Sequence, residues 1–176
     1  EGSIFPMSIE HILNENNKAL LDMLNEEKQF VTDSIQFPSK NKESQLQLVS
    51  WNSRNRYILY INRKSNITTR YTLQNRIHDS FILLRLDLDN KPHRNPDGEK
   101  ISGNHLHLFD RQDPSGSWAF ELTNPDLNIL FPKFPFSEIT KSETTQIEQF
   151  RLFCNLCNIP TIPHINIIPE NETLDF

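Results

Sequence analysis

His105 and His107, which are separated by a single residue, carry the strongest chemical signal in this chain of 176 residues. They lie in the segment 104–109, whose alternating pattern predicts a strand. Successive side chains of a strand point to opposite faces, so both imidazoles would share one face while the leucines between them face the core. Paired imidazoles of this kind are typical of acid–base sites and of metal sites.

The preceding predicted strand, residues 81–89, supplies polar partners for these histidines. Its leucines alternate with polar residues that would all lie on the opposite face, namely Arg85, Asp87 and Asp89. If the two strands are neighbours, one arginine, two aspartates and two histidines share a single sheet face. His93 and Arg94, in the loop that connects the strands, would lie over that face.

Histidine and glycine are concentrated in the same stretch. Three of the six histidines lie between residues 93 and 107, and three of the four glycines lie between residues 98 and 116. In a chain with so little glycine, this concentration indicates a backbone that turns tightly or approaches another group closely.

Metal-independent cleavage of RNA is the first chemistry that this set permits, and it needs no cofactor. One histidine acts as general base and the other as general acid, while cationic side chains bind phosphate. The residues assigned to acid–base chemistry are His105, His107 and Asp87, and those assigned to phosphate are Arg85, His93 and Arg94. The resulting hypothesis is a small ribonuclease-like protein acting on RNA, such as the toxin of a toxin–antitoxin pair with a cognate antitoxin as partner.

Binding of a divalent metal is the alternative chemistry for the same residues. His105, His107 and Asp87 would form a set of imidazole and carboxylate ligands for a metal-dependent hydrolase. Two histidines on the same face of one strand suit both chemistries. The charge distribution favours phosphodiester chemistry on RNA over metal binding. The window from residue 54 to residue 111 holds eight Arg and three Lys against five Asp and one Glu, a charge of +5 in a chain of net charge −5.

The acidic remainder of the chain supports a different class of function. Outside the basic window the net charge is −10, and such acidic flanks can imitate nucleic acid and occupy a basic groove. The alternative hypothesis is therefore a non-enzymatic interaction protein of a phage or mobile element that inhibits a nucleic-acid-binding host defence enzyme.

The order of predicted elements is a helix, then five to six strands, then a second helix. The helices are expected over 8–30 and 142–158, and the strands over 46–49, 57–62, 68–73, 81–89, 104–109 and 117–122. This order predicts an α+β fold, with both helices on one face of a twisted antiparallel sheet. The other face would be open to a ligand.

Composition predicts one cytoplasmic domain over residues 7–176. Hydrophobic residues make up 36% and charged residues 23% of the chain, and no apolar run is long enough to span a bilayer. We expect residues 1–6 to derive from a vector, with Met7 as the natural start. Cys154 and Cys157 fall on the apolar side of the second helix, where buried reduced thiols are expected. The sequence leaves the oligomeric state open.

A short stretch resembles a known group of proteins. The quoted elements are Leu84-Arg85-Leu86-Asp87, the loop from Pro92 to Gly98, the segment from Gly103 to His107, and Trp118-Ala119. This pattern over residues 84–122 resembles that of small proteins of bacteria, phages and mobile elements to which no activity is assigned. The resemblance implies a site at these residues but no reaction, and a mobile-element setting would suit a toxin, a nuclease or an inhibitor of host defence.

Overall fold

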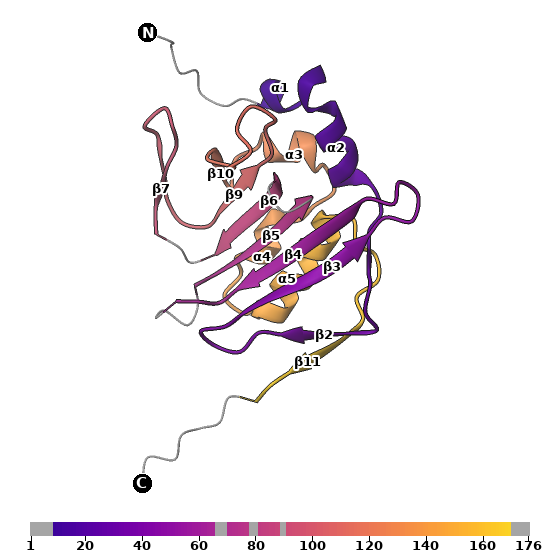
Figure 1. Cartoon of the computed structure of the whole chain (residues 1–176). Helices are drawn as coiled ribbons and strands as arrows, with labels where there is room; N and C mark the ends of the chain where they lie inside the picture. The colour runs from indigo at the N-terminus through magenta and orange to yellow at the C-terminus, as the bar shows by residue number, and fades with distance from the viewer. Residues whose placement is uncertain (1–8, 66–69, 78–80, 89–90, 170–176) are drawn as a thin grey trace.

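Alternating apolar and polar residues build the centre of the molecule, a seven-stranded antiparallel sheet (Figure 1). The structure is a computed structural model that describes residues 9–65, 70–77, 81–88 and 91–169. In spatial order the strands are β1 (Gln29–Phe30), β3 (Glu43–Val49), β4 (Arg56–Asn62), β5 (Tyr71–Ile77), β6 (Phe81–Leu88), β9 (His105–Leu108) and β10 (Ala119–Glu121). The fold class is α+β, as the order of elements predicts.

Two small sheets flank the large one. In the first, β2 (Ser34–Phe37) pairs in parallel with β11 (His164–Ile167). In the second, β7 (His93–Arg94) pairs with β8 (Lys100–Ile101) to form a hairpin. This β7–β8 hairpin is inserted between β6 and β9, and it brings a loop histidine back toward the sheet.

The six predicted strands are present with shifted ends, and the seventh is the edge strand β1. The expected helix over 8–30 extends too far, because α2 ends at Asn25 and the chain then pairs with β3 through Gln29 and Phe30. Residues 8, 68, 69 and 89, which belong to predicted elements, lie outside the described residues.

The helices are shorter than the sequence pattern suggests. They are α1 (Ile9–Ile12), a 3-10 turn (Glu15–Asn17), α2 (Lys18–Asn25), α3 (Leu127–Leu130), α4 (Phe136–Ile139) and α5 (Gln146–Leu156). Asn14 interrupts the N-terminal helix because its side chain accepts a hydrogen bond from the backbone N–H of Asn16. Thr145 caps α5 through a reciprocal capping box with Glu148, so this helix begins at Gln146, four residues later than residue 142.

One hydrophobic core lies between the helices and one face of the sheet. Both α2 and α5 contribute to it, and they do so together with the buried alternate residues of β3 to β6 and β9. The buried free thiols Cys154 and Cys157 belong to this core, as predicted. No helix within the described ranges is long and apolar enough to cross a membrane.

The opposite face of the sheet carries polar side chains in register. One cross-strand row consists of Thr72, Asp87, His105 and Glu121. The next row consists of Gln74, Arg85, His107 and Ala119. We call this the open face, because the core-forming helices pack on the other side.

Lys28 fastens the C-terminal ends of α2 and α5 together. Its ammonium group is fully buried and donates hydrogen bonds to the carbonyls of Leu24 at 2.8 Å, Glu26 at 2.9 Å and Cys157 at 3.0 Å. A cation is favourable at helix C-termini, where carbonyl groups lack intrahelical partners. Burial nevertheless lowers the pKa of Lys28 to about 8 from 10.5.

This lowered pKa predicts a pH-dependent stability. Between pH 8 and 9 the folded chain has released the Lys28 proton while the unfolded chain retains it, so the free energy of unfolding rises with pH. The rise is at most about 1.4 kcal/mol per pH unit. Above pH 9 the buried Cys157, whose pKa is raised to about 12 from 9.0, opposes the rise. Urea unfolding at pH 7.5 to 9 measures the slope, and Lys28→Met should remove it; an unchanged slope in the variant would contradict this assignment.

Candidate functional site

Two cross-strand pairs on the open face form the base of the site. Asp87 lies opposite His105, and Arg85 lies opposite His107, in the β6–β9 register. The two strands are neighbours, although a hairpin is inserted between them, so antiparallel pairing places all four polar side chains on one face. Asp89 lies outside the described residues.

The β7–β8 hairpin brings a third imidazole, His93, against the other two. The centroid of its ring lies 4.7 Å from that of His107 and 5.7 Å from that of His105. Asn95 fixes the hairpin to the edge strand, because its side-chain amide donates to the carbonyl of Ala119 at 3.0 Å and accepts from the N–H of Ala119 at 2.9 Å. The hairpin is therefore attached to β10 by the two side-chain hydrogen bonds of Asn95 and not by backbone strand pairing.

Each of the three imidazoles contacts one backbone carbonyl. Nδ1 of His105 lies 3.0 Å from the oxygen of Gly103, and Nδ1 of His107 lies 2.7 Å from that of Gly116. Nε2 of His93 lies 2.6 Å from the carbonyl oxygen of Ser117. A carbonyl only accepts, so each of these nitrogens carries the proton. The remaining nitrogens are Nδ1 of His93 and Nε2 of the other two rings.

Glycine conformation makes two of these carbonyls available. Gly103 and Gly116 both have positive φ, +71° and +65°, which side-chain-bearing residues rarely adopt. The carboxylate of Asp113 accepts from the backbone N–H of Ser117 at 2.9 Å and from the hydroxyl of Ser115 at 2.5 Å, which holds the second turn. The glycine concentration that the sequence shows therefore serves to direct carbonyl groups at the histidines.

The ring nitrogens converge on one small region. One nitrogen from each of His93, His105 and His107 lies within 4.8 Å of the others. Oδ2 of Asp87 lies 3.1 Å from Nε2 of His105 and 3.3 Å from Nε2 of His107. His105 and His107 are each only 1% exposed, whereas His93 is half-buried. The cluster is therefore accessible mainly from the side of the β7–β8 hairpin.

Arg85 holds the carboxylate in place. Its Nε donates to Oδ1 of Asp87 and its Nη2 to Oδ2, both at 3.0 Å, and Thr72 donates to Oδ1 at 3.2 Å. Although burial alone would raise it, hydrogen bonding to His105 together with the charge and hydrogen bonds of Arg85 holds the pKa of Asp87 far below its usual range. The carboxylate is therefore ionised.

His107 is held neutral. Burial is the main cause that lowers its pKa, and the Arg85 charge acts in the same direction, while Asp87 opposes them. Its Nδ1 donates to Gly116, so its Nε2 carries a lone pair, which accepts from Nη2 of Arg85 at 2.8 Å. This is the protonation state of a metal-ligating imidazole.

His105 has acceptors at both ring nitrogens, a carbonyl at Nδ1 and the ionised carboxylate of Asp87 at Nε2. Two acceptors require either an imidazolium that donates from both nitrogens or a cation between Nε2 and the carboxylate. A divalent ion in that position would satisfy the lone pair and the carboxylate together.

The donor set fits a zinc-type ion. Ligand atoms about 2.1 Å from a tetrahedral zinc lie roughly 3.4 Å apart, close to the separations of Asp87 Oδ2 from the two Nε2 atoms. The three imidazole nitrogens, which lie up to 4.8 Å apart, need to approach one another by as much as about 1.4 Å. Metal-ligating histidines commonly donate their other N–H to a carbonyl or a carboxylate, and all three rings have such a carbonyl.

The structure brings together five of the six residues that the sequence singled out. The exception is Arg94, which follows His93 on β7 and therefore points the opposite way. Its side chain is exposed, and it donates to the carbonyl of Gly98 within its own hairpin at 2.9 Å. From sequence alone, we expect His93 to bind phosphate and not a metal, because a loop residue has no periodic pattern that fixes the direction of its side chain.

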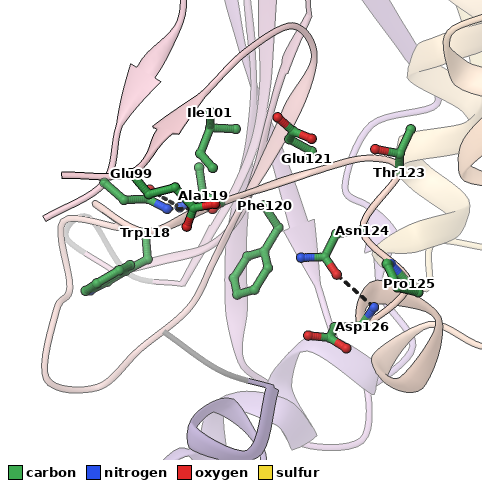
Figure 2. A pocket seen from close by; sticks show the side chains of 11 residues that line it. Glu99, Ile101, Trp118, Ala119, Phe120, Glu121, Thr123, Asn124, Pro125 and Asp126 are labelled. Carbon is green, nitrogen blue, oxygen red and sulfur yellow. Dashed lines mark hydrogen bonds between the residues drawn. The ribbon is translucent and has the colours of Figure 1, made fainter. Parts of the chain in front are cut away.

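A hollow of about 340 Å³ lies against the edge strand β10 (Figure 2). It is lined from the β7–β8 hairpin, β10 and the following turn, and its acidic residues are Glu99, Glu121 and Asp126. None of the six predicted site residues lines it. Glu121 and Ala119 nevertheless lie directly opposite His105 and His107 in the β9–β10 register, so the hollow adjoins the imidazoles.

Comparison with known protein families gives one match. Residues 15–159 match the model of a family of unknown function, DUF6978. The chain belongs to this family. The matched region contains every residue of the histidine cluster, Arg85 and Asp87. No curated protein and no solved structure shows a significant match to the chain.

Removal of the carboxylate should destabilise the metal-free protein. Asp87→Ala leaves the part-buried Arg85 without its partner, so the free energy of unfolding should fall by about 3–5 kcal/mol. Urea unfolding in the presence of EDTA measures the change. Asp22→Ala is the matched control, since Asp22 forms only an exposed ion pair with Lys18 and should change stability by less than about 0.5 kcal/mol. Equal effects of the two substitutions would contradict the central role of Asp87.

Proposed function

We propose that this chain binds a divalent metal ion through His93, His105, His107 and Asp87, and that it acts as a metal-dependent hydrolase. One observation supports the proposal above all others. Each imidazole donates one N–H to a backbone carbonyl, and one nitrogen from each ring lies within 4.8 Å of the others. The Asp87 carboxylate lies beside Nε2 of His105 and Nε2 of His107. This arrangement fixes the tautomer and the direction of every ring before the ion binds.

Burial favours the metal over direct acid–base catalysis. A general base has to reach the proton that it removes at roughly 2.6–3.2 Å, and His105 and His107 are each 1% exposed. A metal ion is small enough to reach these nitrogens, and the substrate then needs to reach only the ion. The half-buried His93 and Arg85, whose side chain is 27% exposed, border the accessible side.

Each residue of the chain has a distinct role in this proposal. The three imidazoles and Oδ2 of Asp87 would hold the ion, and Thr72 orients the carboxylate through its hydrogen bond to Oδ1. A bound zinc-type ion supplies a Lewis acid and a hydroxide near neutral pH. Catalytic zinc sites typically have three protein ligands and one open position, so hydrolysis at this site requires either expansion to five ligands or three of these four side chains as ligands.

The metal content of the purified full-length chain tests this proposal. We expect one zinc-type ion per chain by elemental analysis, and its removal by EDTA should lower the thermal unfolding temperature. His93→Ala should weaken metal binding by at least about 100-fold, more than the loss of a group that only orients a ligand. The half-buried hairpin position makes this substitution the least disruptive of the ligand changes.

His164→Ala provides the matched control, because His164 is an exposed histidine on β11 in the other small sheet. It should bind metal as the unchanged chain does. Failure of the protein to take up zinc, cobalt or nickel ions, or unchanged affinity in His93→Ala, would contradict the metal centre.

The ribonuclease hypothesis stays a prediction that the same preparation tests. Cleavage of a fluorescent RNA that survives EDTA and is lost in His107→Ala would support metal-independent acid–base chemistry. Cleavage that EDTA abolishes and zinc restores would support the metal-dependent hydrolase. The interaction-protein hypothesis stays a prediction as well. To test it, the affinity of the chain for a candidate enzyme is measured before and after charge reversal in the acidic flanks.

A further inference from the structure

Arg85 occupies a position that conflicts with a bound metal. Its Nη2 donates to Nε2 of His107 at 2.8 Å and to Oδ2 of Asp87 at 3.0 Å. Those two atoms belong to the proposed ligand set. The lone pair of Nε2 can serve either the guanidinium or the metal, since a neutral imidazole nitrogen has only one. Metal binding therefore releases an N–H of Arg85 beside the ion.

The released guanidinium then needs an anion. A divalent ion, the Asp87 carboxylate and Arg85 together leave two positive charges uncompensated beside rings that are almost fully buried. Repulsion between a metal ion and a guanidinium is strong where little water screens it. The Arg85 side chain is 27% exposed, so it can withdraw from Nε2 toward the accessible side, where an external anion can meet both cations.

The number of oxygens required favours a tetrahedral oxyanion. A guanidinium fork binds two oxygens at once, and the metal takes a third. A carboxylate has only two oxygens, whereas a phosphate or a phosphate ester has three or four. We infer that the site binds a phosphate-type oxyanion, with one oxygen on the metal ion and two on Arg85. This inference rests on the proposed metal centre and names the substrate class for it.

A second guanidinium on the open face supports the same ligand. Gln74 lies opposite Arg85 in the β5–β6 register. When the Gln74 amide is oriented so that both its oxygen and its nitrogen have hydrogen-bond partners, the oxygen accepts from Nη2 of Arg76 at 2.9 Å. The Arg76 guanidinium also lies 5.1 Å from the centroid of the Tyr60 ring. Arg76 is thereby fixed beside the row that contains Arg85 and His107. A phosphate ester on the metal would extend over this basic part of the sheet.

Cobalt(II) provides the direct test, because its visible absorption bands report both metal binding and the arrival of a further ligand. The full chain loaded with one equivalent of cobalt is titrated with inorganic phosphate, and separately with acetate. We expect phosphate to change the bands in a saturable manner and acetate to bind at least about tenfold more weakly. Arg85→Gln should weaken phosphate binding at least about tenfold.

The same variant has a second readout that a purely structural arginine would not affect. Without phosphate, Arg85→Gln should bind cobalt more tightly than the unchanged chain, because no guanidinium competes for Nε2 of His107. Arg85→Lys keeps the positive charge but loses the two-pronged donor geometry. Its affinity for phosphate should lie between those of the unchanged chain and of Arg85→Gln. Arg151→Gln on the exposed side of α5 is the matched control and should leave both affinities unchanged.

The outcomes separate this inference from the metal centre. Cobalt bands that phosphate does not alter, or equal phosphate affinity in Arg85→Gln, would overturn the oxyanion site while the metal centre stands. Acetate binding as tight as phosphate binding would overturn the tetrahedral class. Absence of cobalt bands in the unchanged chain would overturn the metal centre and this inference together.

Discussion

The hydrogen bond from Nδ1 of His107 to the carbonyl of Gly116 determines what the other side of that ring can do. With the proton fixed on Nδ1, Nε2 is a buried lone pair that requires a hydrogen-bond donor or a metal ion. The same constraint applies at His93 and His105 through their own carbonyls. The lone pairs favour positive charge at one point. Arg85 supplies that charge at Nε2 of His107, the proposed ion would supply it to the cluster, and the Asp87 carboxylate balances it.

The backbone around the cluster is organised to supply these carbonyls. Gly103 and Gly116 adopt positive φ, so the chain turns where a residue with a side chain would be strained. The side chain of Asn95 forms hydrogen bonds with both the carbonyl and the N–H of Ala119, and these bonds hold the β7–β8 hairpin over the sheet. These contacts lie outside the hydrophobic core. The apolar packing is therefore on one face of the sheet, and the hydrogen bonds that set the geometry of the histidine cluster are on the open face.

The local pattern of apolar residues indicates whether a segment is a helix or a strand. It does not indicate the residues at which that helix or strand begins and ends. Strand β9 and the second half of β6, residues 84–88, alternate apolar and polar residues, which fixes both their structure and the face that each side chain occupies. Side-chain hydrogen bonds to the backbone decided where the helices begin. Asn14 interrupts the N-terminal helix and Thr145 starts α5, and neither effect has a periodic signal.

The sequence by itself determined that Arg85 and Asp87 share one face of their strand and that His105 and His107 share one face of theirs, because the two-residue period of a strand is a local property. It also located the glycines that the site needs. The pairing of β6 with β9, which joins the two faces, was decided by the tertiary structure. Only the tertiary structure decided that His93 joins these residues, that Arg94 points away, and that each ring nitrogen is assigned to a carbonyl or to the cluster. Those facts depend on how a hairpin folds back over the sheet and on hydrogen bonds between residues far apart in the chain, which no local periodicity encodes.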